Sequence, residues 1–234
     1  MKVAVNQHKA KTETLCMNIT KFKAKGIFFD LDGTIVDSQE AYVEAARTAF
    51  QAVGLESVEA EVTLEIPRKL EKRQPINDII KEDIDKFLNI YLKTYYNISK
   101  TKTKLLPNIA TTLEPLSKKA KLALITMRRV PKKTITAELR HFGIAKYFSC
   151  IVTALDTHNP KPSPEALIKT AKALDLQIGD CIIVGDSISD IRAGKAAGAK
   201  SVAVLTGLFS YKELVEEKPD LIIKNVAKLP KFIE

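Results

Sequence analysis

Two aspartates, Asp30 and Asp32, stand one residue apart directly after the apolar stretch 26–29. In an extended segment, side chains two positions apart lie on the same face, so both carboxylates can approach one target. Two carboxylates this close repel each other, and burying them without a partner costs free energy. A hard divalent cation would relieve that cost, and Mg²⁺ is the obvious candidate. The alternative interpretation is a turn in which the aspartates only cap backbone amides.

Further polar residues follow other apolar stretches in the second half of the chain. Thr126 ends one stretch, Lys161 lies in a proline-rich loop, and Asp186 and Asp190 follow another stretch. Each has a simple alternative interpretation: a strand-end hydroxyl, an exposed loop lysine and a pair of helix caps. Because the carboxyl ends of parallel strands meet at one edge of a sheet, we expect these side chains to gather around Asp30.

The elements that would position them alternate along the chain from residue 106 onward, which is typical of a parallel sheet covered on both faces. We expect helices at 109–119, 132–142, 164–174 and 188–197, and strands at 122–126, 148–153, 181–184, 201–205 and 221–223. Together with a strand at 26–29, they predict an α/β fold with an open parallel, Rossmann-like sheet and helices on both of its faces.

About 70 residues separate the first strand from the next strand unit, which is too long for an ordinary connection in a compact sheet. A helix is expected at 39–53 and another at 76–97, whereas residues 56–75 are charged and poorly periodic, and 97–107 is a polar return segment. A small inserted α-helical cap is the natural interpretation. The expected organisation is an N-terminal extension at 1–25, a core domain at 26–37 and 107–234, and the cap insert at 38–106.

Composition places the chain among soluble globular proteins, with 45% apolar and 28% charged residues among 234. No stretch approaches the roughly 18 apolar residues of a membrane span, and the polar start lacks the apolar region of a signal peptide. We therefore expect a cytoplasmic protein with no membrane partner, either a monomer or a homodimer. The three cysteines are odd in number and scattered, so neither a disulfide framework nor a zinc site is indicated.

The net charge of +9 could attract nucleic acid or a phosphorylated small molecule. Lysines are spread along the whole chain without interleaved aromatic residues, which favours solvated helix faces and makes nucleic acid an unexpected partner. Four basic residues of the expected cap, Arg68, Lys69, Lys72 and Arg73, are likewise interpreted as a solvated face.

Four motifs together resemble those of the haloacid dehalogenase superfamily: F-F-D-L-D-G-T, L-I-T, the lysine of N-P-K-P-S-P-E, and V-G-D-S-I-S-D. The chain is most similar to the phosphatases of that superfamily that carry a helical cap, in their phosphoglycolate phosphatase-like branch. The resemblance covers about residues 26 to 225. It implies that Asp30 is a nucleophile, that Asp32 is a general acid and base, and that Asp186 ligates Mg²⁺.

In the same way, the resemblance implies that Thr126 and Lys161 hold the phosphate, together with the backbone amide of Met127. The backbone carbonyl of Asp32 would complete the metal site alongside Asp30 and Asp186, and Asp190 would orient Lys161 or a metal-bound water. For its acid role, Asp32 must be protonated when substrate binds. We expect the neighbouring carboxylate to favour this by raising the pKa of Asp32.

One departure from the family pattern concerns the residues after Thr126. Relatives of this branch commonly follow the threonine with asparagine, whereas this chain has Met127, Arg128 and Arg129. Our hypothesis is that Arg128 or Arg129 attracts a second anionic group on the substrate, because guanidinium pairs well with carboxylate or phosphate. An arginine at the exposed start of a helix is an equally good interpretation.

The sequence thus predicts a Mg²⁺-dependent phosphatase that hydrolyses small-molecule phosphate monoesters through an aspartyl-phosphate, with phosphoglycolate as one candidate substrate. Alternatives are a sugar phosphomutase of the same superfamily, a nucleic-acid end phosphatase and a non-catalytic basic binding protein. A haloacid dehalogenase is disfavoured, because displacement of a halide from carbon needs neither Asp32 nor a Mg²⁺ site. The complete set of motif residues argues against a binding protein.

Overall fold

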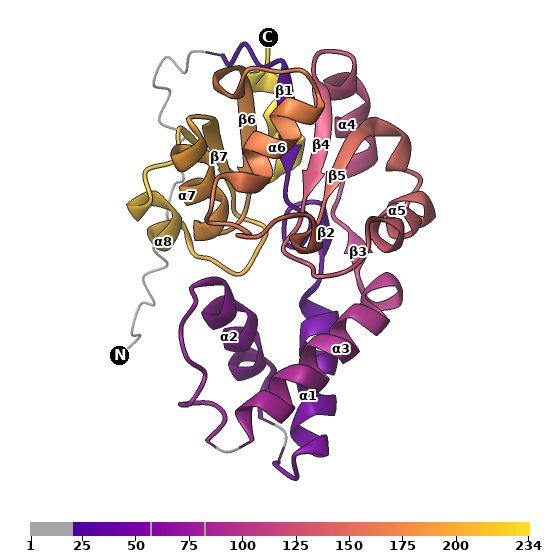
Figure 1. Ribbon diagram of the computed structural model, residues 1–234, viewed down its shortest axis with the longest axis vertical. Helices are drawn as coiled ribbons and strands as arrows, with labels where there is room; N and C mark the ends of the chain where they lie inside the picture. The colour runs from indigo at the N-terminus through magenta and orange to yellow at the C-terminus, as the bar shows by residue number, and fades with distance from the viewer. Residues whose placement is uncertain (1–20, 57, 82) are drawn as a thin grey trace, which may run out of the picture.

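A six-stranded parallel sheet organises the larger part of the molecule (Figure 1). The computed structural model describes residues 21–56, 58–81 and 83–234. The strands are β1 (Gly26–Phe29), β4 (Lys121–Ile125), β5 (Phe148–Val152), β6 (Cys181–Gly185), β7 (Lys200–Val204) and β8 (Leu221–Ile223). Their order across the sheet is β5-β4-β1-β6-β7-β8. This doubly wound order reverses direction beside β1, where open α/β sheets place their ligand sites. The predicted fold class is confirmed.

Helices cover both faces of the sheet, because the pleat of β1 sends alternate side chains to opposite sides. Ile27 and Phe29 belong to one apolar cluster, with α4 (Ile109–Ser117) and α5 (Lys132–His141). Phe28 belongs to the opposite cluster, with α6 (Glu165–Ala173) and α7 (Ile188–Ala197). The short helix α8 (Tyr211–Glu216) follows β7. β1 is therefore buried on both faces, and its carboxyl end is rigidly placed.

Three helices form a second unit with its own apolar core, and Figure 1 shows it beyond the end of the sheet. They are α1 (Gln39–Ala52), α2 (Ala60–Glu71) and α3 (Ile84–Lys102). The chain enters this unit through β2 (Val36–Asp37) and leaves through β3 (Lys104–Leu105), which pair as an antiparallel ribbon. The two crossings between the units therefore lie side by side.

The helical unit differs from the sequence expectation in two places. α2 lies within 56–75, for which no helix was expected. Its fully buried residues are only Thr63, Ile66 and Pro67, so its apolar stripe is too narrow to be recognised as a helical pattern in the sequence. α3 begins at residue 84 rather than 76, because Asp83 before it adopts a left-handed conformation with φ of 54°. It continues to residue 102, into the segment expected to be a polar return. The apolar residues at 76 and 80 are buried in the turns that precede α3.

Most of the predicted N-terminal extension lies outside the described residues, but its last part contacts the core. The backbone N–H of Phe22 donates to the carbonyl of Phe232 at 2.8 Å, and that of Glu234 donates to Phe22 at 3.1 Å. Ala24 is buried in the same cluster as β1. Residues 22–24 therefore pack against the core. Among the residues described here, no helix combines the length and the apolar character that a membrane span requires.

Candidate active site

The carboxyl ends of three adjacent strands bring the sequence-predicted residues together. Asp30 directly follows β1, Thr126 follows β4, and Asp186 follows β6. Lys161 reaches the same place from the loop between β5 and α6. All four residues are buried. The strand order, with β4 and β6 on either side of β1, accounts for this convergence.

Lys161 pairs with two carboxylates in the interior. Its Nζ donates to Oδ1 of Asp30 at 2.6 Å and to Oδ1 of Asp190 at 2.5 Å. Oδ2 of Asp190 in turn accepts from the hydroxyl and the backbone N–H of Ser187, the N-cap of α7. Burial would lower the pKa of Lys161, but the charges of Asp190 and Asp30 outweigh it and raise that pKa. The start of α7 thus fixes Asp190, which holds the charged Lys161 against Asp30.

Acidic side chains crowd around this lysine. Asp30, Asp186 and Asp190 each offer an oxygen within 4.8 Å of the others. Burial raises the pKa of Asp30, and the charge of Asp190 adds to this against the opposing charge of Lys161. Burial and the charge of Asp30 likewise raise the pKa of Asp186. A buried group of oxygen donors with excess negative charge fits a hard divalent cation.

Two glycines leave room for the Asp186 carboxylate. A Cβ at Gly33, where φ is +78°, would lie 2.5 Å from Oδ2 of Asp186, and one at Gly207 would lie 1.7 Å from the same atom. The hydroxyl of Thr34 donates to Oδ1 at 2.8 Å. The position of Asp186 therefore depends on backbone from two loops that no larger residue could replace without moving it.

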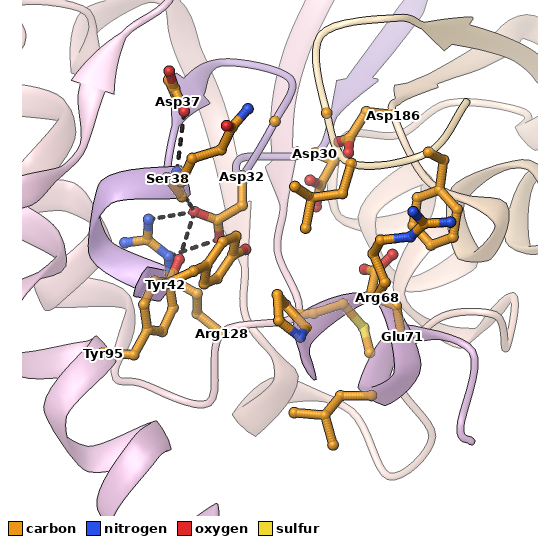
Figure 2. Close-up of a pocket in the computed structure, with 18 of the residues that line it drawn as sticks. Asp30, Asp32, Asp37, Ser38, Tyr42, Arg68, Glu71, Tyr95, Arg128 and Asp186 are labelled. Atoms are coloured by element: carbon orange, nitrogen blue, oxygen red, sulfur yellow. Dashed lines mark hydrogen bonds and ion pairs between the residues drawn. The ribbon is translucent and has the colours of Figure 1, made fainter. Parts of the chain in front are cut away.

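Asp32 faces a different set of partners (Figure 2). The guanidinium of Arg128 donates to both of its oxygens, from Nε to Oδ2 at 2.8 Å and from Nη2 to Oδ1 at 2.6 Å. Oδ1 also accepts from the hydroxyl of Ser38, and from that of Tyr95 at 2.7 Å. Burial would raise the pKa of Asp32, but the charge and hydrogen bonds of Arg128 outweigh it, so the pKa is lowered. The expectation of a raised pKa was wrong, because it considered only the neighbouring carboxylate.

The three residues after Thr126 lie in three different environments. Met127 lines the cavity described below. Arg128 is buried, and besides Asp32 it binds Oε2 of Glu138 at 2.6 Å through Nη1. Arg129 is exposed, and its backbone N–H donates to the hydroxyl of Tyr96 at 3.2 Å. Both carboxylates that the Arg128 guanidinium binds, those of Asp32 and Glu138, therefore belong to the protein itself.

A cavity of about 190 Å³ separates the sheet edge from the helical unit. Its walls are mostly apolar and aromatic and include Tyr42, Tyr91, Tyr95, Tyr96, Leu92, Leu208 and Phe209. Asp30, Asp32 and Asp186 line the core side, and Arg68 and Glu71 line the side formed by α2. Figure 2 shows Arg68 and Glu71 near Asp186, with Arg128 and Tyr95 around Asp32.

Sequence reasoning missed the contribution of α2. Arg68 and Lys72 were expected on a solvated face, but both bind Oε1 of Glu213 in α8 at 2.7 Å and lie over the ring of Phe209. Glu71 was not considered at all. Its neighbours on the helix are charged, so only the tertiary structure distinguishes it.

Glu71 brings a further carboxyl group close to the acidic cluster. Its Oε2 is buried and accepts no hydrogen bond from the residues that the structure describes, and its Oε1 lies 3.5 Å from the Ser189 hydroxyl. Burial, followed by the charge of Asp190, raises the pKa of Glu71 to about 7. This group therefore changes charge near neutral pH.

Comparison with known proteins agrees with this geometry. The sequence profile described as "Haloacid dehalogenase-like hydrolase" matches residues 27–204. The chain is 31% identical to phosphoglycolate phosphatase of Escherichia coli K12, over 88% of this chain and 90% of that protein. It is 28% identical to a Clostridium perfringens protein provisionally named pyrophosphatase PpaX, over 90% of this chain and 97% of that one.

A solved structure described as a predicted phosphoglycolate phosphatase from Haemophilus somnus 129pt superimposes with a TM-score of 0.73. It is 25% identical in sequence, and the match covers 89% of this chain and 97% of that one. The fold and the cluster at the end of β1 thus define a phosphate-ester hydrolase. The chain belongs to the haloacid dehalogenase-like hydrolase family, within the part whose members are phosphatases.

Proposed function

We propose that this enzyme is a Mg²⁺-dependent phosphatase that hydrolyses small-molecule phosphate monoesters through an aspartyl-phosphate formed on Asp30. The observation that carries the proposal is the buried contact of 2.6 Å between Lys161 and Asp30, since Asp30 lines a cavity that Asp32 also lines. A lysine in this position can bind a phosphoryl oxygen while the adjacent carboxylate attacks phosphorus.

In the first step, a carboxylate oxygen of Asp30 forms a bond to phosphorus while the bond from phosphorus to the ester oxygen breaks. The leaving oxygen takes a proton from Asp32. Because Arg128 lowers the pKa of Asp32 in the structure described here, this step requires the negative charge of the bound phosphate ester to raise that pKa again. In the second step, the oxygen of a water molecule forms a bond to phosphorus while the bond from phosphorus to the Asp30 oxygen breaks, which frees inorganic phosphate and the Asp30 carboxylate. Asp32 accepts the proton that this water loses. Lys161 and the backbone amide of Met127, with Thr126 beside it, would hold the phosphoryl oxygens throughout.

The carboxylates of Asp30 and Asp186 and the backbone carbonyl of Asp32 would hold the cation. When bound, Mg²⁺ would neutralise charge on the transferring phosphoryl group. Asp190 is better suited to hold Lys161 than to bind the metal, because both of its oxygens already accept hydrogen bonds. The crowding of carboxylates around a single lysine supports this assignment.

We further propose that residues 38–106 act as a mobile cap on the core formed by 26–37 and 107–234. The cavity lies between the two units, so relative movement would admit substrate and then exclude water. The aromatic wall and Arg68 suit a small leaving group that carries a negative charge. Phosphoglycolate, the substrate in the names of the matched relatives, is a candidate of this kind.

Phosphate release from a panel of small phosphate esters, with and without Mg²⁺, tests the proposal. We expect Mg²⁺-dependent turnover that falls by at least about 10³-fold in Asp30→Asn, because the amide cannot act as the nucleophile. Asp85→Asn, at an exposed position in the first turn of α3, is the matched control and should retain full activity. Full activity of Asp30→Asn, or no turnover of any ester by the wild type, would refute the proposal.

A further inference from the structure

The polar network around Arg128 connects the candidate acid–base residue to both crossings between the core and the helical unit. On one side, the hydroxyl of Ser38 donates to Asp32, and Ser38 lies between β2 and α1 on the first crossing. On the other side, Oε1 of Glu138 accepts from the hydroxyl of Thr103 at 3.0 Å. Thr103 lies between α3 and β3 on the second crossing.

Arg128 joins these two sides. It binds both oxygens of Asp32 through Nε and Nη2, and it binds Glu138 through the remaining nitrogen, Nη1. Its side chain is only 3% exposed and that of Glu138 only 1%, so water does not compete for these bonds. Tyr95 of α3 adds a third link, because its hydroxyl binds Asp32 and Arg128 lies 5.3 Å from the centre of its ring.

We propose that Arg128 is a positioning residue that fixes the orientation of the Asp32 carboxylate and couples it to both crossings of the helical unit. The guanidinium is a planar fork that grips the two oxygens of a carboxylate in one plane, which an ammonium group cannot do. A movement of the helical unit displaces Ser38, Tyr95 and Thr103, which all contact this network. The direction in which Asp32 points therefore depends on the position of the helical unit.

This role rests on the proposed function, because it assigns to Asp32 the proton transfer to the leaving group. It also accounts for the location of Arg128, whose Nε, Nη1 and Nη2 all bind protein carboxylates. A second anionic group of a substrate would have to displace Asp32 or Glu138 to reach this guanidinium. Positioning of Asp32 requires no such rearrangement.

The kinetic test compares an aryl phosphate with an alkyl phosphate in Arg128→Lys, which keeps the charge and loses the fork. An aryl oxide leaves without a proton, whereas an alkoxide needs one. We expect kcat/KM for the alkyl ester to fall by about 10²-fold and that for the aryl ester by less than about fivefold. Glu138→Gln should give the same selectivity with a smaller loss, and Arg140→Lys, exposed at the end of α5, is the control that should retain activity.

A double-substitution cycle shows whether Arg128 acts through Asp32. Asp32→Asn should produce the same selective loss, and adding Arg128→Lys to it should cause no further loss, because the residue being positioned is already inactive. Equal losses for both esters, a further loss in the double variant, or wild-type kinetics in Arg128→Lys would overturn the proposal.

Amide hydrogen exchange provides a readout that does not depend on turnover. We expect Glu138→Gln to speed exchange at both crossings, residues 36–39 and 103–106, although Glu138 contacts only the second. Faster exchange confined to the second crossing would overturn the coupling. If the wild type hydrolyses no ester, the proposed function fails, and the exchange measurement still decides whether the two crossings are coupled through Arg128.

Discussion

Replacing Glu71 by glutamine should stabilise the metal-free protein above neutral pH and leave its stability nearly unchanged near pH 5. Oε2 of Glu71 is buried and accepts no hydrogen bond from the residues described, and its pKa is raised to about 7. Between the ordinary value of 4.5 and about 7, the folded state binds more protons at this group than the unfolded state. Stability must therefore fall as pH rises through that interval.

The size of the effect follows from the two pKa values. The difference between 4.5 and about 7, at 1.36 kcal/mol for each pH unit, corresponds to about 3 kcal/mol at pH 8. The residue as a whole is only partly buried, so water at its exposed edge screens part of the penalty. We expect Glu71→Gln to increase the free energy of unfolding by about 1–3 kcal/mol at pH 8. Glutamine keeps the shape of the side chain and removes only the charge.

Urea unfolding of both proteins at pH 5, 6, 7 and 8 in the presence of EDTA measures this difference directly. Glu61→Gln, at an exposed position in the first turn of the same helix, is the matched control and should show no pH-dependent difference from the wild type. A Glu71→Gln protein whose stability differs from the wild type by the same amount at every pH would refute the reasoning. So would a variant that is less stable than the wild type at pH 8.

Two other substitutions test the acidic cluster. Gly207→Ala should displace Asp186, because the added Cβ would lie 1.7 Å from its Oδ2, and calorimetric titration should show Mg²⁺ binding weakened by at least about tenfold. Gly179→Ala, where a Cβ meets nothing, should bind Mg²⁺ like the wild type. Lys161→Met leaves two buried carboxylates without their cation, and its free energy of unfolding in urea at pH 7 should fall by about 3–5 kcal/mol. A Lys161→Met protein as stable as the wild type would contradict the geometry.

The sheet could be predicted from the sequence because its four inner strands, β4, β1, β6 and β7, are buried on both faces and helices with clear apolar stripes separate the strands along the chain. The strand expected at 181–184 is observed at Cys181–Gly185, and the helix expected at 188–197 is observed at Ile188–Ala197. Both elements carry strong local signals: an apolar run for the strand and an N-cap serine for the helix. The helical unit is smaller and its buried stripes are narrower, which is why α2 was missed.

The partners of the site residues could be predicted only where the fold alone determines them. Parallel strands bring Asp30 and Asp186 to one edge whatever the details of packing. The pairing of Arg128 with Asp32 depends on side chains 96 positions apart in the sequence, and on two crossings whose geometry no local pattern encodes. Glu71 enters the site because α2 packs over the sheet edge, so its burial arises from tertiary structure alone.

Asp30 and Asp32 show how position in the fold can give identical side chains different roles. They stand two residues apart, yet Asp30 receives Lys161 from the loop after β5, and Asp32 receives Arg128 from the loop after β4. Burial and the charge of Asp190 keep the pKa of Asp30 raised against the charge of Lys161. The charge and hydrogen bonds of Arg128, which also binds Glu138, outweigh burial at Asp32 and lower its pKa. The arginine fixes the direction of Asp32. The proposed nucleophile and the proposed acid–base group are thus the same type of side chain, and their different partners give them different roles.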